Sequence, residues 1–152
     1  MALPIVVPDA SVILKWVLPS EDEADAERAL LLRTAIAQEQ VRALVPSLWL
    51  YEVGNTVSRR FPAHASQWLP ALMKFGLEEA RPTERWLANT LDLIARYGGT
   101  FYDAAYHAVA LVNGGVFVTS DLQYIARTGK DVGIMLLAHW QPPEARAKRR
   151  RR

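Results

Sequence analysis

Four acidic residues of this chain stand in apolar surroundings. Asp9 follows the short β-branched run "PIVVP", and Asp121 closes the similar stretch "VFVTSD". Glu52 and Asp103 lie within "LWLYEVGNTV" and "FYDAAYHAVALV", whose other residues are almost all apolar. An ionised carboxylate is costly to bury unless a cation or hydrogen bonds compensate for its charge. The four acids are therefore candidates for chemistry.

None of the four short acidic motifs contains a lysine or an arginine. Carboxylates that converge without a cation raise one another's pKa. Oxygen ligands in a chain without cysteine suit Mg²⁺ or Mn²⁺. Such an ion lowers the pKa of a bound water and offsets the charge of a phosphoryl group. If the four acids meet in space, the pattern indicates phosphodiester hydrolysis.

Two of the acids, taken singly, also have a simpler interpretation. Asp9 suits a turn at a strand end, and Asp103 suits the N-terminal cap of a helix. His107, four residues after Asp103, shares its helical face. We expect a packed or hydrogen-bonded histidine there, because an oxygen-rich pocket does not call for nitrogen. The five tryptophans are scattered among apolar neighbours and are expected in the core or an interface.

The elements that must position these acids alternate between two patterns. Short apolar runs predict strands at 4–7, 41–45, 116–119 and 133–137. Helical patterns are predicted at 19–40, 46–60, 63–77, 82–99 and 101–115. This alternation predicts an α/β fold of three α/β/α layers with a central, mainly parallel sheet. Ligands of such sheets bind outside the carboxyl ends of the strands, where Asp9 and Asp121 are expected.

Local signals refine the helices. Ser20 and Glu23 have the spacing of a capping box, with acids crowded into the first turn. Ser47 is expected to cap the next helix. Pro70 should kink or divide the helix around it. Gly98 is expected just past the end of another.

Length and charge favour one domain with a basic tail. The domain is expected over residues 1–145 and a disordered tail over 146–152. The tail holds six of the 18 basic residues, which leaves 12 basic and 16 acidic residues in the body. Salt-sensitive attachment to nucleic acid is the alternative role of the tail. The absence of cysteine, of a signal peptide and of a long apolar run favours a cytoplasmic protein with no membrane segment.

The acidic motifs also carry a family resemblance. In order, "VVPDASV", "YEVGN", "YDAAYHAVA" and "VTSD" resemble the four acidic motifs of PIN-domain nucleases. The chain resembles the VapC-type toxins of bacterial toxin–antitoxin pairs over residues 4–138, and its most specific part is "YDAAYHAVALV" followed by "VFVTSD". The resemblance implies that the metal-binding catalytic acids are Asp9, Glu52, Asp103 and Asp121. It also implies three supporting polar residues, which are Ser11, Asn55 and Thr119.

What the resemblance implies for function is specific. It predicts a Mg²⁺- or Mn²⁺-dependent endoribonuclease with an RNA substrate, usually a homodimer, silenced by a cognate antitoxin. Asp9 and Asp103 would be the principal metal ligands, while Glu52 and Asp121 would complete the pocket and orient or deprotonate the attacking water. No organic cofactor is implied, and the tail is not part of the family pattern.

Two other functions stay open at this point. One is a PIN-like module without catalysis that only binds RNA or protein. The other is a phosphatase of the haloacid-dehalogenase type, which also places an aspartate after its first strand. Such phosphatases need a second aspartate two residues later, and here that position is Ser11.

Overall fold

A computed structural model describes residues 2–129, 132–143 and 149–151 of the chain. The described strands form one five-stranded sheet in the order β3-β2-β1-β4-β5, and every neighbouring pair is parallel. The strands are β1 (Ile5–Pro8), β2 (Arg42–Pro46), β3 (Glu78–Ala80), β4 (Val116–Thr119) and β5 (Ile134–Leu136). Continuous apolar runs supply the three central strands because helices cover both of their faces.

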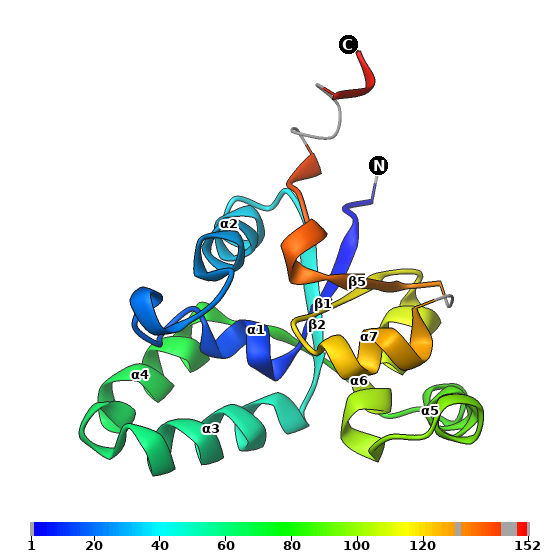
Figure 1. Ribbon diagram of the computed structural model, residues 1–152, viewed down its shortest axis with the longest axis horizontal. Coiled ribbons are helices and arrows are strands. Elements are labelled where there is room, and N and C mark those ends of the chain that lie inside the picture. Colours follow the sequence, from blue (N-terminus) through cyan, green and yellow to red (C-terminus); the bar gives the residue numbers. More distant parts are fainter. Residues whose placement is uncertain (1, 130–131, 144–148, 152) are drawn as a thin grey trace.

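Helices cover the two faces of this sheet. They are α1 (Ala10–Leu14), α2 (Ala26–Ala37), α3 (Leu48–Arg60), α4 (Pro62–Phe75), α5 (Glu84–Tyr97), α6 (Phe101–Asn113) and α7 (Leu122–Thr128), with short 3₁₀ turns at Ser20–Asp22 and Leu137–His139. Figure 1 shows α1 to α4 on one side of the sheet and α5 and α6 on the other. The predicted three-layer α/β/α fold with a parallel sheet is confirmed.

The acidic segment after α1 departs from the prediction. Helix α2 begins at Ala26, and the residue before it, Asp25, has a left-handed backbone (φ 60°). The expected capping box is wrong, since Ser20 lies in the 3₁₀ turn and the Glu23 carboxylate pairs with Lys15 Nζ at 3.0 Å. That ion pair is largely buried, so a tertiary contact outweighs the local capping signal.

Three other local expectations can be compared with the structure. Ser47 has a helical backbone and its side chain makes no capping hydrogen bond, so the predicted cap is wrong. Helix α4 runs undivided through Pro70. Gly98 follows α5 as expected, and its amide donates to the carbonyl oxygen of Ile94.

Strand β3 was not predicted, because "EEA" is a charged three-residue edge strand whose only signal is its pairing with β2.

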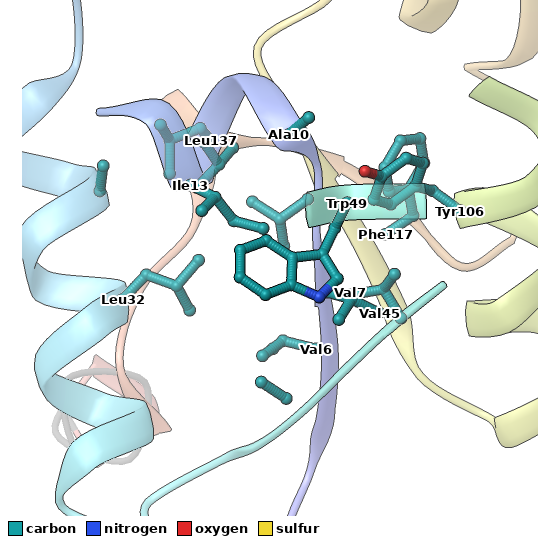
Figure 2. Packing of buried hydrophobic residues seen from close by; sticks show 14 of the residues in the cluster. Val6, Val7, Ala10, Ile13, Leu32, Val45, Trp49, Tyr106, Phe117 and Leu137 are labelled. Atoms are coloured by element: carbon teal, nitrogen blue, oxygen red, sulfur yellow. The ribbon is translucent and has the colours of Figure 1, made fainter. Parts of the chain in front are cut away.

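A shared core fixes the helices that carry the acids. Trp49 of α3 is 3% exposed and points into the core beside Ile13, Val7 and Val45 (Figure 2). Its indole Nε1 donates to Glu79 Oε1 at 3.1 Å, which ties α3 to the edge strand β3. Burying one such large side chain stabilises the fold by roughly 1.5–3 kcal/mol. Helix α3 is thereby held with a defined face toward the sheet.

Helix α6 is the central helix of the opposite layer. Residues 104–110 are all buried, and the helix contacts β1, β2 and β4. Only its first turn, with Phe101, Tyr102 and Asp103, reaches the surface at the carboxyl edge of the sheet. The predicted domain boundary at 145 and residues 146–148 and 152 of the tail lie outside the described residues, so the expected disorder of the tail stays a prediction.

Candidate active site

Asp9 lies where β1 ends and α1 begins. Its amide donates to the carbonyl oxygen of Val118 at 2.9 Å, which holds it against β4. Its Oδ2 accepts hydrogen bonds from Thr119 Oγ1 at 2.8 Å and from Ser11 Oγ at 3.0 Å. Asp9 therefore occupies the expected strand-end turn, but its carboxylate is committed to two hydroxyls of the site.

Burial dominates the electrostatics of Asp9. The residue is 8% exposed, and this loss of water raises its pKa to about 6. The hydrogen bonds from Thr119 and Ser11 act in the opposite direction, and the charge of Asp103 raises the pKa further. A carboxylate with a raised pKa lacks sufficient positive charge nearby, which is the situation a bound cation would relieve.

The end of β4 connects Asp9 to Asp121. Thr119 is fully buried, and its Oγ1 also accepts a hydrogen bond from the Asp121 amide at 3.0 Å. Asp121 Oδ1 accepts from the amides of Gln123 and Tyr124, each at 3.0 Å, and so caps α7. One oxygen of Asp121 thus has a structural role.

Asp103 lies in the first turn of α6 rather than at its cap. The cap is Thr100, whose Oγ1 accepts from the Asp103 amide at 3.2 Å and lies 3.1 Å from Asp103 Oδ2. The alternative that Asp103 is only an N-cap is therefore wrong. Burial raises the pKa of Asp103, the Thr100 hydroxyl lowers it, the charge of Asp121 raises it, and the guanidinium of Arg127 lowers it.

Glu52 reaches the same region from α3. Burial is the main cause that raises its pKa to about 7; the hydroxyl of Tyr106 lowers this pKa, and the charges of Asp9 and Asp103 raise it. Glu52 Oε1 and the Tyr106 hydroxyl are both buried, yet neither has a hydrogen-bond partner of normal geometry among the described residues. The two groups therefore interact electrostatically without completing a hydrogen bond.

The four acids belong to one electrostatic cluster at the carboxyl edge of the sheet. The charge of Asp9 affects Glu52, the charge of Asp103 affects both Asp9 and Glu52, and the charge of Asp121 affects Asp103. Ser11 and Thr119 adjoin the cluster through Asp9. Asn55 is exposed, and its backbone carbonyl accepts from Ser58 Oγ at 3.3 Å.

The donor set suits a hard divalent cation. It consists of carboxylate oxygens, and burial raises the pKa values of Asp9, Glu52 and Asp103. Among the described residues, the buried Glu52 Oε1 has no hydrogen-bond partner. Within the part of the chain that the structure describes, no three acids or histidines lie close enough together to hold a metal ion as they stand. Glu52, Asp103 and Asp121 are half-buried, and their side chains would have to move closer to Asp9 to hold an ion together with it.

Three neighbours of the acids were missed in the sequence. Tyr106 follows Asp103 by one helical turn in the quoted motif, and that spacing was the available signal. Ser120, between Thr119 and Asp121, has a buried hydroxyl without a partner among the described residues. Arg127 is brought to Asp103 only by the fold, and its Nη2 lies 2.9 Å from where a side chain of Gly99 would begin.

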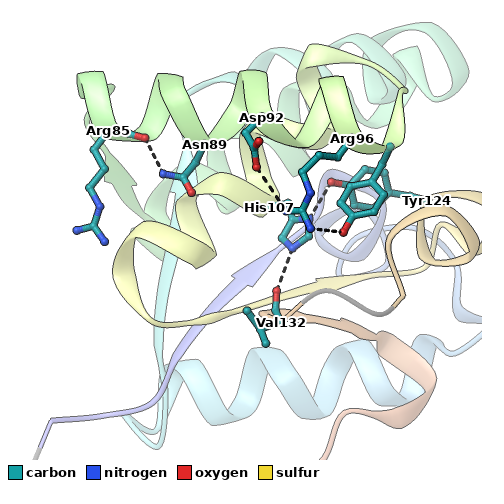
Figure 3. Close-up of polar contacts among 8 residues, drawn as sticks. Arg85, Asn89, Asp92, Arg96, His107, Tyr124 and Val132 are labelled. Carbon is teal, nitrogen blue, oxygen red and sulfur yellow. Dashed lines mark hydrogen bonds and ion pairs between the residues drawn. The ribbon is translucent and has the colours of Figure 1, made fainter.

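His107 has a packing role, as expected. It is fully buried, its Nδ1 lies 2.8 Å from the Tyr124 hydroxyl, and its Nε2 lies 3.2 Å from the carbonyl oxygen of Val132 (Figure 3). The carbonyl can only accept, so Nε2 carries a proton and donates to it. The tryptophans also pack as expected, with Trp16, Trp49 and Trp140 buried.

Comparison with known proteins identifies the family. The family model described as "PIN domain" matches residues 6–131, which is most of the chain. The chain belongs to the PIN domain family. The match includes the whole acidic cluster, β1 without its first residue, and β2, β3 and β4. No curated protein matches the sequence.

Solved structures share this PIN fold. PAE2754 from Pyrobaculum aerophilum is 26% identical, with a TM-score of 0.61 and coverage of 91% of this chain and 93% of that one. A toxin-antitoxin complex from Klebsiella pneumoniae is 11% identical, with a TM-score of 0.63 and coverage of 87% and 97%. FitAcB from Neisseria gonorrhoeae is 14% identical, with a TM-score of 0.59 and coverage of 89% and 99%.

Across the described residues, this PIN domain has no helix that is both long and apolar enough to cross a bilayer.

Proposed function

We propose that this PIN domain is a Mg²⁺- or Mn²⁺-dependent endoribonuclease and the toxin of a toxin–antitoxin pair. One observation carries the enzymatic part: four electrostatically coupled carboxylates lie at the carboxyl edge of the sheet, and Glu52 Oε1 is buried there without a hydrogen-bond partner among the described residues. PIN domains are generally metal-dependent nucleases, which supports the same reaction class.

The residues of the site would have different roles in the reaction. A divalent ion bound here would supply a Lewis acid beside the scissile phosphate. Asp9 and Asp103 would hold it, and the hydroxyls of Thr119 and Ser11 keep the Asp9 carboxylate in one orientation. Glu52, whose pKa is raised by burial in the metal-free fold, would orient the attacking water or accept its proton.

Two further residues shape the charge of the site. Asp121 is fixed by its capping bonds, and its remaining oxygen would orient the water or complete the pocket. Ser11 occupies the position where a haloacid-dehalogenase phosphatase requires its second aspartate, and its hydroxyl is a donor to Asp9 instead. This arrangement offers no acid–base pair of that phosphatase type.

The proposed partners follow from the relatives. The similar structure from Klebsiella pneumoniae is a toxin-antitoxin complex, and a structure of FitAB bound to an IR36 DNA fragment is also similar in fold. We propose a small antitoxin for this chain as well, with a homodimer as the acting form in the cytoplasm. An arginine of the antitoxin would pair bidentately with the free carboxylates.

RNA cleavage by the purified protein tests the proposal. Wild type should cleave single-stranded RNA with Mg²⁺ or Mn²⁺ and not with EDTA. Asp103→Asn should lose at least about a hundredfold in rate, since it removes one proposed ligand charge. Asp22→Asn, an exposed acid in the 3₁₀ turn, is the matched control and should cleave normally. Equal cleavage by wild type with and without metal would refute the mechanism.

A further inference from the structure

An uncharged pocket adjoins the acidic cluster and has no assigned role. Its volume is about 240 Å³, and it lies between the start of α3, the turn after β3 and the starts of α5 and α6. Its walls are formed mainly by Pro46, Leu48, Pro82, Trp86, Phe101 and Tyr102. None of the described residues that line it is charged, although Asp103 directly follows Tyr102, one of the lining residues, in α6.

Two residues that line the pocket lie beside acids of the candidate active site. Tyr102 precedes Asp103 in the first turn of α6. Leu48 lies four residues before Glu52, so the two share a face of α3 and are separated by about 6 Å along its axis. Figure 1 shows the beginning of α3 and the first turn of α6 facing one another across the edge of the sheet. The pocket therefore lies where a ligand bound at the acids would place the group next to its bound atoms.

The aromatic side chains of the pocket are preorganised and accessible. Trp86 Nε1 donates to the carbonyl oxygen of Ala105 at 3.0 Å, which fixes the indole. Its ring meets that of Phe101 edge to face, with centroids 5.8 Å apart. Phe101 is 41% exposed and Tyr102 is 60% exposed. Large exposed aromatic surfaces beside a site commonly mark a binding function.

We propose that this pocket binds one unpaired base of the RNA substrate, next to the scissile phosphate. The inference rests on the proposed function for the nature of the substrate. Bases stack on aromatic side chains without needing charge, and a neutral pocket attracts a base even though the neighbouring acids repel phosphate. The pocket would then place the phosphate over the acids and would prefer single strands, because a paired base cannot enter it.

Binding of abasic RNA tests the pocket separately from catalysis. A short single-stranded RNA and a set of copies, each lacking one base, are titrated against wild type in EDTA, which suppresses cleavage. One missing base should weaken wild-type binding about 5- to 150-fold, the range expected for the loss of one stacked base. Tyr102→Ala should bind the parent RNA as weakly as wild type binds that abasic copy, and should show no further loss with the copy. Tyr102→Phe should behave like wild type.

Tyr51→Ala is the matched control. Tyr51 is 77% exposed on α3 and does not line the pocket, so its loss should leave the abasic penalty unchanged. The proposal is overturned if Tyr102→Ala keeps the penalty, or if no single base matters to wild type. It is also overturned if Tyr102→Ala changes the oligomeric state in sedimentation while RNA binding stays the same, since the pocket is then a protein interface.

The same experiments distinguish this inference from the proposed function. If wild type binds one base through Tyr102 but never cleaves RNA with Mg²⁺ or Mn²⁺, the base pocket is supported and the nuclease function is refuted. If wild type cleaves RNA and Tyr102→Ala equals wild type in RNA binding and in KM, the nuclease function is supported and the base pocket is refuted.

Discussion

Thr119 Oγ1 donates to Asp9 Oδ2 at 2.8 Å, although 110 residues separate the two in the chain. The bond joins the carboxyl ends of β4 and β1, and the same hydroxyl accepts from the Asp121 amide. Thr119 is fully buried, so its removal would leave the Asp121 amide without this acceptor and Asp9 Oδ2 with only the hydrogen bond from Ser11. One side chain thus orients two of the four acids.

Thr119→Val should therefore damage both stability and activity. The substitution keeps the shape of the side chain but leaves Asp9 and the Asp121 amide each short of a partner. We expect a loss of about 1–3 kcal/mol in the free energy of unfolding, measured by urea denaturation, and a fall in kcat. Thr90→Val is the control, because Thr90 is equally buried but bonds only to the carbonyl oxygen of Trp86 within α5. Equal effects of the two substitutions on kcat would contradict the role of Thr119.

Without metal, the protein should become less stable as the pH rises from 5 to 8. The pKa of Asp9 is raised from 3.8 to about 6, and that of Glu52 from 4.5 to about 7. The folded state therefore binds more protons than the unfolded state in this range, and folding weakens as those protons leave. The stabilisation is complete below about pH 4 and is lost as the pH passes through 6 and 7. A loss on the order of 1–3 kcal/mol is expected from thermal or urea unfolding in EDTA.

The double variant Asp9→Asn/Glu52→Gln isolates this effect. It keeps the size of both side chains and removes their titration, so its stability should vary less between pH 5 and 8. A wild-type protein that grows more stable across this range, relative to the double variant, would show that the acids are compensated by charge in the metal-free fold.

Mg²⁺ or Mn²⁺ should raise the melting temperature of wild type at pH 8. A ligand that binds only the folded state adds about 2.7 kcal/mol at a hundred times its dissociation constant. Asp103→Asn should lose most of this metal-induced shift, and its metal-free form should be at least as stable as wild type because repulsion among the acids falls. Asp22→Asn should retain the full shift. Identical shifts in wild type and Asp9→Asn/Asp103→Asn would place the metal elsewhere.

His107→Ala should destabilise the fold without a direct effect on catalysis. It opens a cavity and leaves the Tyr124 hydroxyl and the Val132 carbonyl without the imidazole, which should cost about 2–4 kcal/mol in urea denaturation. At a temperature where the variant is folded, its kcat should match that of wild type. His64→Ala, an exposed histidine that stacks on Trp68, should cost less than about 1 kcal/mol. A folded His107→Ala protein with a hundredfold lower kcat would assign His107 to the site.

The sequence by itself determined the layers of the fold and marked the four acids as candidates for the site. Apolar runs at 4–7 and 116–119 are local signals, and a parallel sheet brings the ends of such strands to one edge. The resemblance in "YDAAYHAVA" and "VTSD" indicated the PIN family, which the match over residues 6–131 confirms. Both inferences work because strand alternation, helix periodicity and motif order are properties of neighbouring residues.

Local capping signals were less reliable than the apolar pattern. Ser20 and Glu23 have capping-box spacing, but Glu23 pairs instead with Lys15, in a largely buried contact. A capping bond stabilises a helix by about 1 kcal/mol, and a partly buried ion pair within a packed turn can outweigh it. Strand β3 carries almost no local signal, since its two glutamates are explained only by Arg42 and Trp49 across the fold.

Only the tertiary structure decided how the acids are supported. The Thr119–Asp9 bond, the buried Tyr106 hydroxyl beside Glu52 and the approach of Arg127 to Asp103 all join residues whose distance in the sequence carries no information about their contact. The raised pKa values of Asp9 and Glu52 likewise come mainly from burial, with the charge of Asp103 acting on both residues and that of Asp9 acting on Glu52. Desolvation and Coulomb interactions depend on positions in space, and those positions exist only once α3, α6 and the strand ends have packed together.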